Sequence, residues 1–187
     1  MIHTLERDLE VELARGRLEF CYSVQNSKVR FEEKILRHHK GVRSHWLSYV
    51  LAARPAVMLT APIIYSTILA FALLDAAVSV YQRTCFRVYG VALVRRSDHF
   101  AFDRAQLSYL NGFERFNCWF CSYGNGVISY AREIAARTEQ YWCPIKHSRR
   151  VLGSHERYYA FADFGDADAY ALVLADLRKQ LHDERAP

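Results

Sequence analysis

The sequence contains no internal repeat, no low-complexity tract and no obvious linker, which argues against a repeat array and a long disordered tail. Its first 19 residues are charged and lack the apolar core of a secretory signal. Five cysteines without an export signal indicate a reducing compartment. The basic residues are interspersed with acidic ones and match no nucleic-acid-binding motif, so we expect no nucleic-acid partner.

The composition is that of a folded chain with a sizeable core. Of its 187 residues, 51% are hydrophobic and 14% are aromatic. The net charge is +5 and the isoelectric point is near 9.0, which favours anionic partners such as acidic lipid headgroups.

Residues 55–74 form an apolar run of 20 residues without a single charge. As a helix, 20 residues cover about 30 Å, which is the thickness of the hydrocarbon core of a bilayer. Trp46, Tyr49 and Tyr81 flank the run, as aromatic residues do at membrane interfaces. The run therefore predicts a membrane helix or a re-entrant membrane segment, and membrane lipids as partners. The alternative is a fully buried helix of a soluble domain.

Two residues complicate a simple membrane span. Pro62 lies inside the run and is expected to kink or break a helix there. Asp75 follows the run, where its carboxylate could reach an interface or face a protein partner in the membrane. Both flanks of the run are basic, so the positive-inside rule gives no clear orientation. We favour a cytoplasmic location for the cysteine-containing half, because its thiols then stay reduced.

The pattern of apolar residues and turn signals predicts a mainly α-helical fold with a small β component. A compact Cys/His-containing C-terminal half is expected to follow the membrane segment. We divide the chain into a charged helical region (1–50), an apolar membrane segment (51–82) and a Cys/His domain (83–187). The individual elements expected are helices at 4–20, 32–50, 103–116, 127–141 and 166–181, a hairpin at 21–31, a strand or interfacial segment at 85–94, and a turn at 124–126.

The most specific pattern is a pair of close ligand motifs. Cys118 and Cys121 form C-x2-C, and Cys143 and His147 form C-x3-H after a gap of 21 residues. Three thiolates and one imidazole are a ligand set for structural zinc, and an iron–sulfur cluster is the alternative. If the four side chains converge, they predict a Cys₃His metal site with no open position for catalysis.

Convergence depends on the structure between the two pairs. Because Cys143 precedes Pro144, we expect it to cap a short helix that ends near Arg150. His147 would then lie one turn further along the same face. The preceding helix must end early, near residues 137–138, for the pairs to meet. Buried or incidental thiols and a redox-active C-x2-C are the alternatives, although no βαβ context supports a redox motif.

Other polar residues near these motifs have weaker patterns. The glutamates of residues 103–141 are expected to neutralise nearby arginines, because the E-x-x-H repeat of a carboxylate metal site is missing. His155 is a spare ligand or base. A basic patch beside His147 is either a solvated face or an anion site. The residues concerned are Glu114, Glu133, Glu139, Arg115, Arg132, Arg137, Lys146, Arg149, Arg150, Asp98, His99 and Asp103.

Four segments, APIIYS, DRAQLSYLNGFER, CWFCSYGNG and YAREIAARTEQYWCPIKH, carry a resemblance that covers residues 61–147. The chain resembles an uncharacterised group of small bacterial membrane-associated proteins with a C-x2-C and YWCPIKH motif. The resemblance implies a bacterial source and a membrane location, and it transfers no activity.

The leading function is that of a bacterial inner-membrane metal-binding protein, in a binding, assembly or electron-transfer role. Whether the chain is an enzyme stays open. One alternative is a membrane enzyme that acts on a lipid or another amphiphile, and another is an interaction subunit without chemistry.

Overall fold

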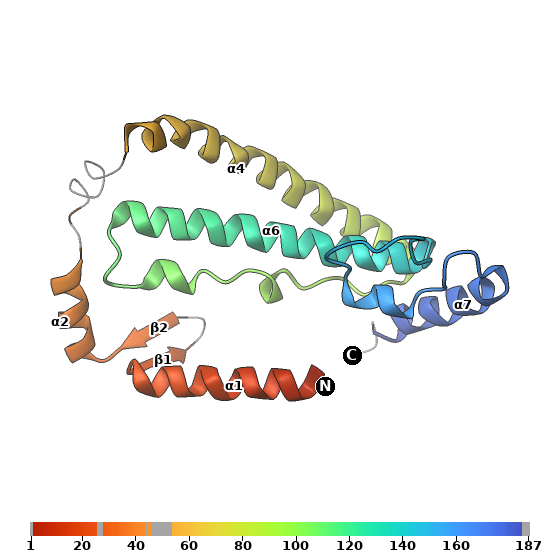
Figure 1. Ribbon diagram of the computed structural model, residues 1–187, viewed down its shortest axis with the longest axis horizontal. Coiled ribbons are helices and arrows are strands. Elements are labelled where there is room, and N and C mark those ends of the chain that lie inside the picture. Colours follow the sequence, from red (N-terminus) through yellow and green to blue (C-terminus); the bar gives the residue numbers. More distant parts are fainter. Residues whose placement is uncertain (1, 26–27, 44, 46–53, 185–187) are drawn as a thin grey trace. The chain divides into compact units, whose positions relative to one another are not determined.

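The computed structural model describes residues 2–25, 28–43, 45 and 54–184. These residues are mostly helical, with a single two-stranded sheet among them (Figure 1). The chain divides into two compact units, one of Met1–Ala61 and Ala101–Ser122, the other of Pro62–Phe100 and Tyr123–Pro187. The prediction of a mainly helical chain with a small β component is therefore confirmed, whereas the three-part division of the sequence stays a prediction.

The first unit begins with helix α1 (Ile2–Glu19), followed by strands β1 (Tyr22–Gln25) and β2 (Lys28–Phe31). The strands form the expected antiparallel hairpin, in which Tyr22 pairs with Phe31 and Val24 with Val29. Helix α2 (Glu33–Val42) follows, so the described part of the second expected helix is shorter than the sequence indicated. Residues 46–50 of that expected helix, and Trp46 and Tyr49, lie outside the described residues.

Helix α4 (Pro55–Tyr81) contains the apolar run and continues through Pro62. The helical path extends beyond it through a π-helical turn, η1 (Gln82–Phe86), and the short helix α5 (Arg87–Tyr89). It ends at Gly90, whose φ of 72° is the left-handed conformation that terminates many helices. Of the two alternatives for residues 85–94, a strand or an interfacial segment, the strand was wrong, because local β propensity is overridden by a helix that enters from α4.

Two short 3₁₀ turns, η2 (Arg96–Asp98) and η3 (Asp103–Gln106), precede helix α6 (Gly112–Trp142). The expected helix at 103–116 is therefore only a turn and the first part of α6. Asn111 and Glu114 form a reciprocal capping box at its start. The Asn111 N–H donates to Glu114 Oε2 at 2.8 Å, and the Glu114 N–H donates to Asn111 Oδ1 at 3.0 Å.

Helix α6 runs without interruption through Gly124 and Gly126, where the sequence indicated a turn. The two glycines provide space for aromatic rings instead. A Cβ atom on Gly124 would lie 2.8 Å from the Phe71 ring, and one on Gly126 would lie 2.6 Å from the Phe100 ring. The turn prediction was wrong because a glycine signals close approach of a neighbour as well as a reversal of the chain.

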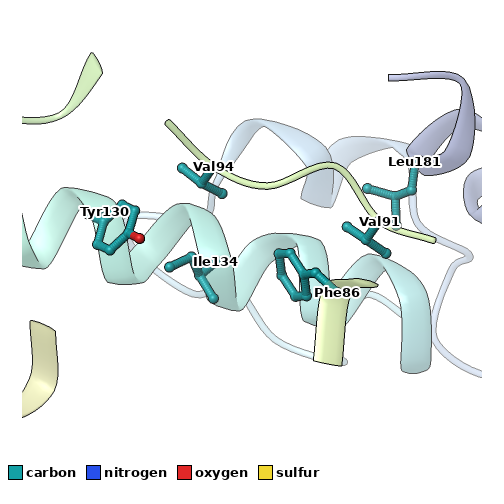
Figure 2. Close-up of a cluster of buried hydrophobic side chains, with 6 residues drawn as sticks. All are labelled: Phe86, Val91, Val94, Tyr130, Ile134 and Leu181. Carbon is teal, nitrogen blue, oxygen red and sulfur yellow. The ribbon is translucent and has the colours of Figure 1, made fainter. Parts of the chain in front are cut away.

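After α6 the chain passes through η4 (Glu156–Ala160) to α7 (Ala167–Asp183). The Asp166 side chain accepts a hydrogen bond of 2.9 Å from the Ala169 N–H, which confirms the predicted N-cap of this last helix. The second unit is held together by one buried cluster that joins η1, the segment after α5, α6 and α7. Its six residues are Phe86, Val91, Val94, Tyr130, Ile134 and Leu181 (Figure 2).

Candidate functional site

Helix α4 is apolar over most of its surface and carries large apolar side chains that are exposed. Residues 58–89 are the one stretch among the described residues that is long and apolar enough to cross a membrane, and none of its most apolar window is buried. Large apolar side chains stand exposed along it, with Leu59 78% exposed and Leu69 and Leu73 each 73% exposed. An apolar helix of this kind needs either a protein interior or lipid around it.

The hydroxyl groups inside the apolar run are satisfied within α4 itself. Ser66 Oγ donates to the Ile63 carbonyl oxygen at 2.7 Å, and Thr67 Oγ1 donates to that of Ile64 at 2.6 Å. Neither side chain therefore needs water as a partner for its proton. Pro62 lacks an N–H group, and its place inside the helix is a feature that membrane helices tolerate.

Towards its C-terminal end, α4 carries a carboxylate that is paired inside the second unit. Asp75 Oδ2 lies 2.5 Å from Arg96 Nη2 and accepts a hydrogen bond of 3.1 Å from the Tyr123 hydroxyl. The Asp75 side chain is 14% exposed, and the Arg96 guanidinium lies 4.2 Å from the centre of the Phe100 ring. Asp75 is thus mostly buried and paired within the second unit.

Beyond Asp75, the buried side-chain amide of Gln82 in η1 is a second polar group that faces the protein. The Gln82 side chain forms two hydrogen bonds with the main chain of Val94. Its Oε1 accepts from the Val94 N–H at 3.0 Å, and its Nε2 donates to the Val94 carbonyl oxygen at 3.4 Å. Its Nε2 also bonds the Tyr130 hydroxyl, which contacts the Ser79 hydroxyl. The polar groups of Asp75 and Gln82 therefore face protein, while the apolar residues on the other sides of α4 do not.

The four predicted metal ligands lie at different places along the chain. Cys118 and Cys121 are in α6, one turn apart, and Cys143 and His147 follow its end. The early end of the helix near residues 137–138, on which convergence depends, does not occur, since α6 continues to Trp142. Within the described ranges, no group of three or more His, Cys, Asp or Glu side chains is placed to hold a metal ion.

Cys143 and Pro144 end a helix and do not begin one, so the prediction of a short helix to Arg150 was wrong. Proline disfavours a helical conformation in the residue before it, which explains why α6 stops at Trp142. Pro144 is fully buried, and its carbonyl oxygen accepts from the Ala162 N–H at 2.9 Å. The segment then runs as an isolated parallel bridge, Ile145 with Ala162.

The other residues of this motif also have structural partners. Lys146 Nζ lies 2.8 Å from Asp163 Oδ1. The His147 ring stacks on the Tyr158 ring at 5.9 Å between centres, and the His147 N–H donates to the Tyr158 hydroxyl at 2.7 Å. The specific sequence around Cys143 is therefore accounted for by packing against η4 and the residues after it.

His155 acts as a helix cap with a defined tautomer. The Tyr158 N–H donates to His155 Nδ1 at 3.1 Å, so this nitrogen carries no proton. The proton is then on Nε2, which lies 2.8 Å from Glu139 Oε2. Both ring nitrogens are engaged, so His155 is neither a spare ligand nor a free base in this arrangement.

An ion-pair network joins α6, η4 and the end of α7. Arg157 donates to both carboxylate oxygens of Glu184, at 2.8 and 3.0 Å, and to Glu133 Oε1 at 3.0 Å. Arg137 Nε donates to the same Glu133 oxygen at 2.8 Å, which confirms the predicted pairing of these neighbours. The contributions of Arg157 and Glu184 were missed, because no spacing in the sequence links positions so far apart.

The network changes the acidity of its central carboxyl group. Burial alone would raise the pKa of Glu133, but the hydrogen bond from Arg137 and the charges of Arg157 and Arg137 outweigh it. The net pKa of Glu133 therefore lies below its ordinary value. Burial would also lower the pKa of Arg157, and the two glutamates beside it reverse that effect and raise it.

Beside this network lies a cleft of about 490 Å³, lined by His99, Ser129, Arg132, Glu133, His155, Glu156 and Arg157. His99 Nδ1 and Ser129 Oγ are 2.8 Å apart in it. The arginines are occupied, since Arg132 donates to the carbonyl oxygens of Gly153 and Ser154 and Arg157 binds the two glutamates. A membrane enzyme therefore stays a prediction, and the cleft does not indicate a substrate for it.

No protein-family model, no curated protein and no solved structure matches the chain significantly. The resemblance to small bacterial membrane-associated proteins therefore stays a prediction from the quoted motifs.

Proposed function

We propose that the chain is a small bacterial inner-membrane protein that is anchored by α4 and serves as a binding or assembly subunit. The observation that carries this proposal is the one-sided covering of α4. Its carboxylate and the amide that follows it face protein, whereas leucines on other sides are about three-quarters exposed. In water, such a surface favours aggregation; in lipid, it is the ordinary surface of a membrane helix.

The polar groups of the apolar run agree with this setting. A hydroxyl in hydrocarbon is tolerated when its proton has an acceptor, and both Ser66 and Thr67 bond a carbonyl of their own helix. An ionised carboxylate is tolerated there when a cation or another donor faces it, as Arg96 and Tyr123 face Asp75.

Membrane fractionation with alkaline carbonate extraction tests the anchor. We expect the wild-type chain to stay in the membrane pellet. The variant Leu69→Lys/Leu73→Lys places two charges on exposed apolar positions of α4, each of which costs about 2.5 to 3.5 kcal/mol at the centre of a membrane helix. We expect this variant to be lost from the pellet or degraded.

A matched control is Leu152→Lys/Leu172→Lys, which changes two leucines that are 84% and 77% exposed outside α4. This control should fractionate like the wild type. Release of the wild-type chain by carbonate, or equal behaviour of the two double variants, would contradict the anchoring role of α4.

Metal binding by Cys118, Cys121, Cys143 and His147 is a second proposal, and one observation favours it. Cys118 and Cys121 are three residues apart in α6 and so share one face of the helix, where two thiolates could serve one metal. Elemental analysis of the purified chain tests it. Zinc near one ion per chain would support a zinc site, and about two to four irons per chain with a brown colour would support an iron–sulfur cluster. A metal-free chain would remove it.

A further inference from the structure

A second cavity, of about 730 Å³, lies in the first unit and is lined by both basic and aromatic side chains. It is lined by Lys40, Arg43, His45, Asn111, Gly112, Phe113 and Phe116. Two of these residues, Lys40 and Arg43, are basic, and one is a histidine. Its volume is in the range of small-ligand sites in proteins.

Among the residues that the structure describes, none neutralises the two basic side chains of this cavity. The side chains of Lys40 and Arg43 form no ion pair or hydrogen bond with any residue that the structure describes. The residues that line the cavity include no carboxylate within the described chain. Glu114, the acid next to Phe113, directs its carboxylate to the Asn111 N–H at the helix cap. The cavity thus presents positive charge for which an anion from outside is the complement.

The cavity lining also contains two aromatic rings, those of Phe113 and Phe116. Phe113 and Phe116 are 44% and 47% exposed, although both are large aromatic side chains. A free inorganic anion gains nothing from contact with these rings, whereas an anion that carries a hydrocarbon chain can contact both the basic and the aromatic residues of the lining. The combination of cations and rings therefore favours an amphiphilic anion.

The positions of the two basic residues in the sequence favour one kind of amphiphilic anion, an acidic lipid. Lys40 and Arg43 lie 15 and 12 residues before Pro55, the first residue of α4. Basic residues this close to a membrane helix are those that interact with the acidic lipids of the adjacent surface.

We propose that this cavity binds the headgroup phosphate of an acidic phospholipid through Lys40 and Arg43, with Phe113 and Phe116 against the start of its acyl chains. This inference rests on the proposed anchoring by α4, and it adds a lipid site to the first unit.

The basic residues beside His147 are a weaker place for such a ligand. Lys146 already pairs with Asp163, and Arg149 and Arg150 are exposed on an irregular segment. They therefore serve as a control, since their substitution removes the same two charges elsewhere.

The test uses the full chain purified in a non-ionic detergent and titrated with dioctanoyl phosphatidylglycerol in a calorimeter. Dioctanoyl phosphatidylcholine and inorganic phosphate are the comparison ligands. We expect saturable binding of the anionic lipid only. Lys40→Gln/Arg43→Gln should weaken that binding by about thirtyfold, since each basic residue near a lipid surface contributes about a factor of five. Arg149→Gln/Arg150→Gln should leave it unchanged.

Three outcomes overturn the lipid site: equal binding of the two lipids, equal loss in the two double variants, or binding of inorganic phosphate as tight as that of the anionic lipid. Phe113→Gln gives a second readout, because it should weaken lipid binding while Lys40 and Arg43 are intact. These titrations are independent of carbonate extraction, so a chain that stays in the membrane without lipid preference refutes the site and leaves the anchor in place.

Discussion

Asp75 and Arg96 form an ion pair with 2.5 Å between Oδ2 and Nη2, although Asp75 directly follows the uncharged run. Arg96 lies 21 residues further along the chain, in the turn η2. The pair explains how a carboxylate is accommodated on a helix that has no other charged residue. The guanidinium and the Tyr123 hydroxyl together replace the water that an aspartate normally requires.

Removal of the cation alone should be more damaging than removal of both charges. We expect Arg96→Gln to lower the free energy of unfolding by about 2 kcal/mol, because the mostly buried carboxylate of Asp75 loses its charged partner. Asp75→Asn/Arg96→Gln should recover part of this loss. Thermal unfolding followed by circular dichroism in detergent measures both. Arg95→Gln, which breaks an exposed pair with Asp98, should change stability by less than about 0.5 kcal/mol. Equal effects of Arg95→Gln and Arg96→Gln would contradict this interpretation.

Gly124 and Gly126 of α6 should not tolerate a methyl group, despite the better helix propensity of alanine. Gly124→Ala would force the new Cβ to 2.8 Å from the Phe71 ring, and Gly126→Ala to 2.6 Å from the Phe100 ring. We expect each to lower stability by about 1 to 3 kcal/mol. Gly16→Ala in α1 is the matched control, since nothing lies within 4 Å of its added Cβ. It should raise stability by up to about 1 kcal/mol, and a rise at Gly124 of the same size would refute the close approach.

Stability should fall in acid through the network around Glu133. Because its pKa in the folded chain lies below the ordinary value of 4.5, the stabilisation is complete above about pH 4.5 and is lost as the pH falls through the folded pKa. Thermal unfolding between pH 7 and pH 3 measures this loss. Glu133→Gln should be less stable at pH 7 and less sensitive to acid. Glu156→Gln, which removes the carboxylate of a neighbouring exposed residue, should keep the wild-type slope.

Without a shared metal, thiols in the first half of α6 and beyond its end should behave independently, because α6 is continuous between them. A maleimide should label Cys143 at the same rate in the wild type and in Cys121→Ser, because both residues are exposed and 22 positions apart. Faster labelling of Cys143 in the variant would instead indicate that a shared metal protects it in the wild type. Cys85→Ser, which changes a half-buried thiol outside both motifs, is the control.

Local signals predicted the elements that depend on nearby residues. The α1 helix, the hairpin of β1 and β2 and the Asp166 cap all follow from side chains within a few positions of one another. The apolar run likewise predicts α4, because its length alone indicates a helix long enough to cross a membrane.

The sequence patterns that gave wrong predictions were those that fit two different local structures. Gly124 and Gly126 indicate either a turn or a close packing partner, and only the positions of Phe71 and Phe100 decide between them. Cys143 before Pro144 fits the start of a helix as well as its end, and the uninterrupted helix before it decides the matter. The pairs Asp75–Arg96 and Glu133–Arg157 could not be predicted, since tertiary structure brings these arginines to the carboxylates.

The rings inserted at the two glycines of α6 have a consequence for movement along the helix. A smooth apolar helix can slide or rotate against its neighbour at little cost, because every position offers a similar surface. In the second unit, the Phe71 ring instead packs against Gly124 and the Phe100 ring against Gly126. These two glycines lie about half a turn apart on α6. Displacement by even one residue would bring a ring against a side chain, so the second unit has a fixed register rather than a sliding contact.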